Sequence, residues 1–137
     1  MKTDPLQKQH AELNDLIREL FQYFDQPDKL PENKYKCRMC LTHLHQRLQL
    51  HLAMEDNIYY PKMCKSLNSE LAQKALEIQA QNARVKEQFD YFVHTWTSHH
   101  ISLHPHEFIT QAKSICEKLQ TRMEQENIEL YAFGEGF

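Results

Sequence analysis

The segment LAQKALEIQAQNARVKEQFDYFVHTW, residues 71–96, carries an apolar stripe with the spacing of an α-helix. Its members recur at alternating intervals of four and three residues, so they share one helix face. They are Leu71, Ala75, Ile78, Asn82, Val85, Phe89, Phe92 and Trp96. Asn68 or Ser69 can cap this helix at its start. Asn82 is the one strongly polar member, and it interrupts the stripe near its middle.

Three further stripes with the same spacing occur elsewhere in the sequence. Their members are Leu6, His10, Leu13, Ile17, Leu20 and Phe24; then Cys37, Cys40, Leu44, Leu48, His51, Glu55 and Ile58; and last Ala112, Ile115, Leu119, Arg122, Glu126 and Leu130. Pro31 and Pro105 can open helices, and Pro61 closes or kinks one. Four amphipathic helices with short connections predict an all-α fold, an up-down-up-down four-helix bundle that residues 1–137 form as a single domain.

The composition of the chain argues against some functional classes. The formal net charge of -3 shows no electrostatic footprint for nucleic acid. Without an apolar signal segment or a run of membrane-spanning length, we expect no membrane association and a cytoplasmic location. The four cysteines are interpreted as reduced thiols, since a chain of 137 residues can build a core without disulfides. Nine histidines are a high count that first suggests metal chemistry.

The polar interruptions of the four stripes fall at one depth of the predicted bundle. His10 lies about fifteen residues before the first turn and His51 about eighteen after it, so each is about 22 to 28 Å from that turn at about 1.5 Å per residue. The same counting brings Asn82, Arg122 and Glu126 to this level. An unpaired buried polar group costs about 1 to 3 kcal/mol, so these side chains must satisfy one another or share a ligand.

Four of these side chains are suited to a metal ion. His51 and Glu55 are four residues apart, so both can reach one cation from the same helix face. His10 and Glu126 would complete the cluster from neighbouring helices. Two imidazoles and two carboxylates suit one non-haem ion, with iron as the first choice and zinc and manganese as competitors.

At this point the sequence resembles the hemerythrin-like cation-binding domains over essentially its whole length. The most specific segment is HLAMEDNIYYP, residues 51–61, and it is echoed by residues 122–131. The resemblance implies a four-helix bundle with a carboxylate-bridged pair of non-haem irons, used in oxygen binding or storage, in iron or oxygen sensing, or in responses to nitric oxide. The ligand positions of the family match His10, His51, Glu55 and Glu126.

Two positions depart from the family pattern. Asn82 and Arg122 stand where the family usually has histidines on its third and fourth helices. The resemblance then implies half of the usual site, which holds one metal ion. Arg122 is a permanent positive charge that can pair with Glu55 or Glu126 in place of the second ion.

Aromatic hydroxyls follow the acidic residues of this layer in sequence. Tyr59, Tyr60 and Tyr131 are close enough to donate hydrogen bonds to the carboxylates, and we assign this role to Tyr59. An ordinary contact at a helix end explains these tyrosines equally well.

Other interpretations stay open at the level of sequence. The layer can be a metal-free network in which Arg122 bridges Glu55 and Glu126, within a helical module whose surface carries an interaction or regulatory function. Cys37 and Cys40 form a CxxC motif that lacks a second ligand pair, so core-lining thiols are the default interpretation. No motif of an enzyme acting on an organic substrate is present. We therefore expect binding or sensing of metal, or of a small diatomic ligand such as oxygen or nitric oxide.

Overall fold

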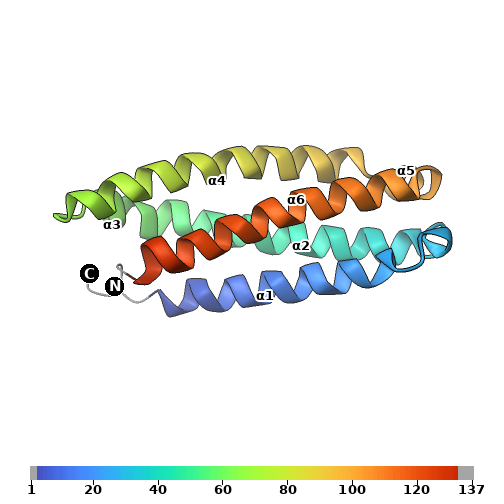
Figure 1. The fold of residues 1–137 in the computed structure, drawn as a ribbon, viewed down its shortest axis with the longest axis horizontal. Coiled ribbons are helices and arrows are strands. Elements are labelled where there is room, and N and C mark those ends of the chain that lie inside the picture. Colours follow the sequence, from blue (N-terminus) through green and yellow to red (C-terminus); the bar gives the residue numbers. More distant parts are fainter. Residues whose placement is uncertain (1–2, 133–137) are drawn as a thin grey trace.

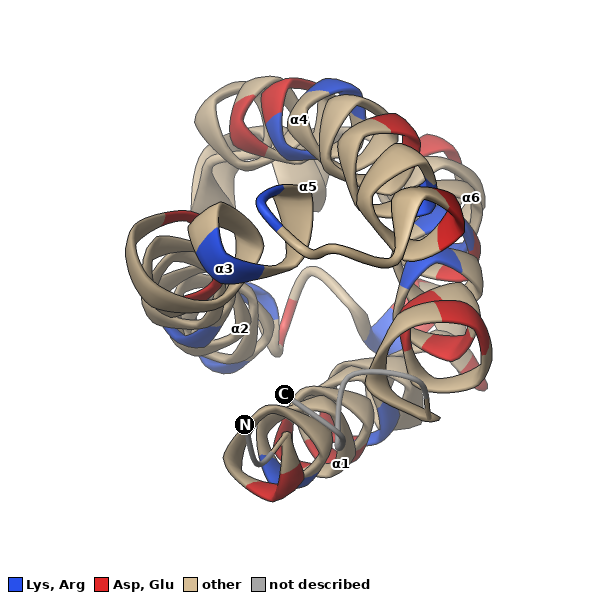
Figure 2. Cartoon of the chain, turned by 90° about the vertical axis from the view of Figure 1, so that its left-hand side faces the viewer, with Lys and Arg blue, Asp and Glu red and all other residues tan. Residues whose placement is uncertain are grey.

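The computed structural model describes residues 3–132, and four long helices form its frame. They are α1 (Asp4–Phe21), α2 (Lys34–Met54), α4 (Ser69–Thr95) and α6 (Pro105–Glu126). Consecutive long helices run in opposite directions (Figure 1). Viewed along the bundle, they surround a common axis (Figure 2). The all-α up-down-up-down bundle predicted from the sequence is confirmed.

Short elements connect the long helices. Two 3-10 turns, η1 (Gln22–Phe24) and η2 (Pro27–Lys29), join α1 to α2. The helix α5 (Ser98–Leu103) joins α4 to α6. At the opposite end of the bundle, α2 continues through a π-helical turn, η3 (Glu55–Tyr59), into α3 (Tyr60–Cys64). A second π-helical turn, η4 (Asn127–Tyr131), extends α6.

Local sequence explains most of the helix boundaries. The side chain of Asn68 accepts a hydrogen bond from the Leu71 N–H and caps α4. Pro105 is in the first turn of α6, where its missing N–H costs nothing. Pro31 was expected to open the second helix, but α2 begins at Lys34 after a turn. No helix within residues 3–132 is long and apolar enough to cross a bilayer.

Pro61 does not end the helical path that begins with α2. The Tyr60 N–H donates to the Glu55 carbonyl five residues back, so the wide turn η3 carries the chain past the proline. The extra residue in this turn rotates the helix beyond it. Ile58 was expected on the inner face, but it is 47 % exposed, while Tyr60 is buried.

The buried apolar residues form two separate clusters. The larger cluster fills the end of the bundle near α5 and includes Leu13, Leu48 and Met123. The smaller cluster includes Leu6, Tyr60, Ile78 and Leu130. Along each long helix, followed into η3 and α3 after α2 and into η4 after α6, the buried polar residues lie between members of the larger cluster and members of the smaller one. The polar layer therefore separates two apolar halves of one core.

Candidate metal centre

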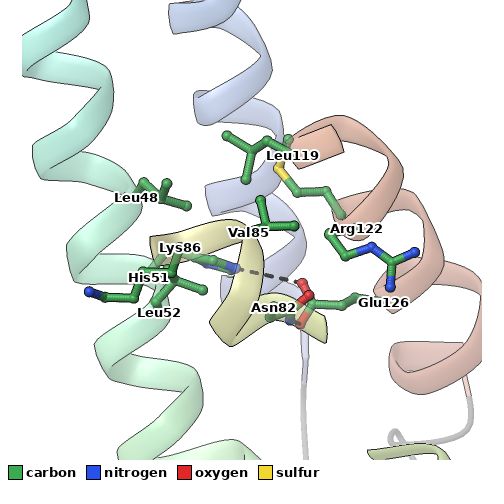
Figure 3. Close-up of a pocket in the computed structure, with 10 residues that line it drawn as sticks. Leu48, His51, Leu52, Asn82, Val85, Lys86, Leu119, Arg122 and Glu126 are labelled. Atoms are coloured by element: carbon green, nitrogen blue, oxygen red, sulfur yellow. Dashed lines mark hydrogen bonds and ion pairs between the residues drawn. The ribbon is translucent and has the colours of Figure 1, made fainter. Parts of the chain in front are cut away.

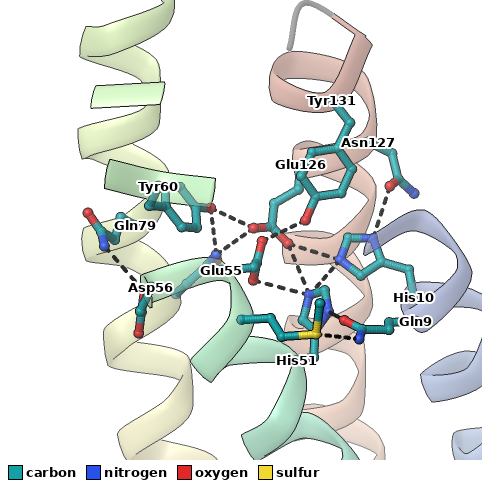
Figure 4. A network of polar contacts seen from close by, with 12 residues as sticks. Gln9, His10, His51, Glu55, Asp56, Tyr60, Gln79, Glu126, Asn127 and Tyr131 are labelled. Atoms are coloured by element: carbon teal, nitrogen blue, oxygen red, sulfur yellow. Dashed lines mark hydrogen bonds and ion pairs between the residues drawn. The ribbon is translucent and has the colours of Figure 1, made fainter. Parts of the chain in front are cut away.

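Four potential metal ligands meet inside the polar layer. His10 comes from α1, His51 from the last turn of α2, Glu55 from the start of η3 and Glu126 from the end of α6 (Figure 4). Each is at most 2 % exposed. One ligand atom from each residue lies within 4.8 Å of the others. The structure thus brings together the four residues that the sequence analysis predicted as metal ligands.

The inner atoms of this cluster are closely spaced. His10 Nε2 lies 3.0 Å from His51 Nε2 and 3.1 Å from Glu126 Oε1. His51 Nε2 lies 3.1 Å from Glu55 Oε1 and 4.0 Å from Glu126 Oε1. Two ring nitrogens and two carboxylate oxygens therefore surround one point.

Amide oxygens orient both imidazoles. His10 Nδ1 bonds to Asn127 Oδ1 at 2.9 Å, and His51 Nδ1 bonds to Gln9 Oε1 at 2.7 Å. The Gln9 amide nitrogen donates in turn to Met54 Sδ, which keeps the amide oxygen toward His51. Since an amide oxygen only accepts, each Nδ1 carries a hydrogen, which leaves Nε2 as the ring atom that can bind a cation at the centre.

The two π-helical turns place a tyrosine five residues after each glutamate. Tyr60 follows Glu55, and its hydroxyl donates to Glu126 Oε2 at 2.5 Å. Tyr131 follows Glu126, and its hydroxyl donates to Glu55 Oε2 at 2.6 Å. Figure 4 shows the two phenols approaching from opposite sides. Each carboxylate therefore has one oxygen held by a phenol and the other directed at the histidines.

Asn82 on α4 completes this arrangement. Its Nδ2 donates to Glu126 Oε2 at 3.0 Å and to the Tyr60 hydroxyl oxygen at 3.1 Å. Asn82 thus supports a ligand carboxylate through its side-chain amide. This agrees with the supporting position that the sequence indicated.

Burial and mutual proximity set the charges of the layer. Burial, together with the negative charge of Glu126, raises the pKa of Glu55 well above the usual range. Burial also opposes ionisation of Glu126, but the facing Glu55 carboxyl, His10 and His51 outweigh it and lower its pKa. Burial and the same carboxylates raise the pKa of Tyr60 and of Tyr131, which therefore remain donors. Of the two facing carboxyls, Glu55 therefore holds a proton more tightly than Glu126 does.

The donor set fits a divalent cation. Glu55 Oε1 is buried and has no hydrogen-bond partner among residues 3–132. Together with Glu126 Oε1 and the two Nε2 atoms, it forms a group of four potential ligand atoms within 4.8 Å of one another. A cation accepts all four, and two carboxylates neutralise its charge. Iron, zinc and manganese all accept this combination of imidazole and carboxylate.

Arg122 differs from its expected place. The flanking residues Leu119, Met123 and Glu126 form the buried face of α6, which leaves Arg122 beside that face and partly exposed. Its guanidinium donates to the Gln81 side chain. In Figure 3 the side chains of Arg122 and Glu126 point in different directions from α6. Within residues 3–132, Arg122 forms no ion pair with an acidic side chain, so the predicted bridge to the glutamates is absent.

Tyr59 also differs from the expectation. It packs, partly buried, against the smaller apolar cluster, while Tyr60 donates to the carboxylate. The π-helical turn explains the change because it moves the inward position from the fourth to the fifth residue after Glu55. The repeated spacing of Glu55 to Tyr60 and Glu126 to Tyr131 is the sequence signal for this pairing.

The amide partners of the histidines were not predicted. Gln9 directly precedes His10 in sequence and Asn127 directly follows Glu126. Each supports a histidine on a helix other than its own. Their adjacency to ligand residues was the only available signal, and it does not say which way the side chains turn.

Comparison with known families agrees with this geometry. The hemerythrin HHE cation binding domain matches residues 1–133. The chain belongs to this family. No curated protein and no solved structure matches it in the corresponding comparisons. Membership in the hemerythrin HHE family implies cation binding. Among residues 3–132, the cluster of His10, His51, Glu55 and Glu126 could hold the ion.

Proposed function

We propose that this protein binds one non-haem metal ion, with iron as the first choice, and that it serves in the binding or sensing of metal, oxygen or nitric oxide. His10, His51, Glu55 and Glu126 would hold the ion. The observation that carries the proposal is the convergence of four buried lone-pair atoms, with both Nδ1 atoms bonded to amide oxygens.

A bound ferrous ion would supply a redox-active centre with room for a small diatomic ligand. The residues of this chain fix the remaining properties of the site. The two phenols and Asn82 hold the outer carboxylate oxygens, which leaves one oxygen of each glutamate for the ion. The apolar clusters on either side keep bulk water away from the layer.

The choice of metal follows from ligand chemistry. Imidazole and carboxylate together suit iron, and zinc and manganese are the competitors. Because no thiolate takes part in the cluster, ions that prefer sulfur gain no advantage. The cellular supply of each metal then decides which ion occupies the site.

The test is metal analysis after anaerobic purification with ferrous iron supplied. Wild type should retain close to one equivalent, and His51→Ala should retain none. His45→Ala is a matched control, because His45 is on the same helix but bonds to Asp90 outside the layer. A wild-type protein that stays empty in micromolar iron would contradict the proposal.

The competing function is a metal-free interaction or regulatory module. In that interpretation, Arg122 was expected to supply the positive charge that pairs with the buried glutamates. In the structure its guanidinium instead donates a hydrogen bond to the Gln81 side chain. A metal-free layer would then depend on protons shared among the histidines and glutamates. Empty wild-type protein with full stability would favour this module.

A further inference from the structure

A thioether lies at the outer end of the contacts that orient His51. Met54 is the last residue of α2, three positions after His51, and the Gln9 amide reaches both side chains from α1. Gln9 Nε2 donates to Met54 Sδ at 2.9 Å, and Gln9 Oε1 accepts from His51 Nδ1 at 2.7 Å (Figure 4). The sulfur atom therefore determines which end of the Gln9 amide faces the histidine.

The two ends of this amide have opposite hydrogen-bonding properties. With Gln9 Oε1 toward His51 Nδ1, the ring keeps a hydrogen on Nδ1, and Nε2 is the atom that can bind a cation. A reversed amide would present an N–H to Nδ1 and would favour the tautomer with its hydrogen on Nε2. That tautomer cannot bind an ion at the centre. A change at Met54 Sδ can thus reach the proposed metal site without altering any ligand residue.

Oxidation to the sulfoxide is the characteristic chemical change of a thioether. Hydrogen peroxide transfers one oxygen atom to the sulfur, its O–O bond breaks and water leaves, so the sulfur is oxidised and the peroxide is reduced. The product is polar and larger than the thioether. Its oxygen replaces the sulfur of Met54 as the acceptor for Gln9 Nε2, and the amide must leave its present place to meet it.

Peroxide can reach the Met54 side chain, which is partly exposed. Met63 and Met123 are 1 % and 3 % exposed, so the core shields them. Met39 is 70 % exposed, but it lies about four turns before Met54 on α2, away from the polar layer. Among the described methionines, Met54 is thus the one that is both accessible and linked by hydrogen bonds to a proposed ligand.

We propose that Met54 is a site of reversible oxidation, through which peroxide lowers the affinity of the centre for its cation. The effect on affinity rests on the proposed cation site, whereas the oxidation itself does not. The sulfoxide turns the Gln9 amide away from His51 Nδ1 and removes the acceptor that orients the ring. Loss of such a supporting partner weakens metal binding about 10- to 100-fold. Methionine sulfoxide reductases reverse the modification.

The test uses the full chain with Met39→Leu, which removes the other exposed methionine. Peroxide is added after all metal has been removed by chelation, and peptide mass spectrometry locates the added oxygen. Zinc affinity is then measured by competition with a coloured chelator, because zinc undergoes no redox reaction. We expect oxygen on Met54 but not on Met63 or Met123. Zinc affinity should fall about 10-fold and recover after treatment with methionine sulfoxide reductases.

A second measurement does not depend on metal. Nitrogen-15 NMR follows the ring nitrogens of both histidines in the metal-free protein. Oxidation should shift the resonance of His51 Nδ1, which bonds to Gln9, much more than that of His10 Nδ1, which bonds to Asn127. A merely structural role of Met54 would not single out the Nδ1 atom of one histidine.

A matched variant controls for oxidation of the cysteines. Met39→Leu with Met54→Leu has no accessible methionine among the described residues, so peroxide should change neither its zinc affinity nor its His51 resonance. An equal loss of zinc affinity in this variant would assign the effect to other residues and would overturn the inference.

The remaining outcomes separate the inference from the proposed function. Failure of peroxide to oxidise Met54 would overturn the inference alone. Oxidation of Met54 that leaves either the His51 resonance or the zinc affinity unchanged would do the same. A wild-type protein that takes up neither zinc nor ferrous iron would overturn the proposed function, while the His51 resonance would still decide whether Met54 acts on the ring.

Discussion

Glu55→Gln should stabilise the metal-free protein while impairing cation binding. Glu55 is 1 % exposed, and its Oε1 has no hydrogen-bond partner among the described residues. A glutamine has the same shape, carries no charge, and can donate an N–H to the lone pairs of His51 or Glu126. Removing one unsatisfied buried atom is worth about 1 to 3 kcal/mol in the free energy of unfolding. The melting temperature should rise by about 3 to 10 °C for a chain of this length.

The gain in stability from Glu55→Gln should increase as the pH rises. The folded-state pKa of Glu55 is raised by burial above its unfolded value of 4.5. The contribution of Glu55 to stability is therefore complete below pH 4.5 and is lost as the pH rises through the folded pKa. Urea unfolding of metal-free wild type and Glu55→Gln across this range should show a difference that grows with pH.

A matched variant separates this effect from loss of any negative charge. Glu129 lies near the same end of the bundle, is 35 % exposed and is 3.9 Å from Lys74. Glu129→Gln should leave both metal-free stability and cation affinity nearly unchanged. Glu55→Gln should weaken cation binding by more than about 100-fold, since it removes a ligand and not a supporting contact. A variant that is less stable than metal-free wild type at neutral pH would refute the reasoning about Glu55.

Three other outcomes are expected from the same structure. Tyr131→Phe removes the hydrogen bond to Glu55 and should lower cation affinity about 10- to 100-fold, measured by competition with a coloured chelator; equal affinity would show that the phenol does not position the carboxylate. Cation binding should release protons because Glu55 must ionise, and the affinity for the cation should therefore rise with pH. Calorimetry in buffers of different ionisation enthalpy counts the released protons. A result of no released protons would contradict the raised pKa of Glu55. Burial raises the pKa of Cys116 to about 12, so iodoacetamide should label the half-buried Cys64 of the native protein well before Cys116. Peptide mass spectrometry measures the two labelling rates. Equal rates would place Cys116 at the surface.

The fold could be predicted from the sequence because every long helix carries a regular apolar stripe. Leu71, Ala75 and Ile78 illustrate this, since their spacing and their burial agree. The π-helical turns could not be predicted in the same way. Their effect is a shift of one residue, which depends on how the chain passes Pro61 and on contacts across the bundle. Ile58 and Tyr59 were misplaced for this reason.

The ligand cluster could be predicted because its residues interrupt apolar stripes at one depth. His10 and Glu126, 116 positions apart in the sequence, were brought together by counting residues from the turns. The direction in which a side chain points could not be predicted in this way, as Arg122 shows. It is one position from the buried Met123, and a long flexible side chain at that edge can turn inward or outward with little change in the backbone. The neutral Gln81 side chain provides its partner on the outer side.

The central claim is that His10, His51, Glu55 and Glu126 bind one metal ion together. Its most direct test is an anomalous difference map at the iron absorption edge, from crystals grown anaerobically with ferrous iron. We predict one peak inside the polar layer, about 2.0 to 2.2 Å from the two Nε2 atoms and from one oxygen of each glutamate. A layer without a peak, or a peak that touches only some of these four residues, would contradict the account.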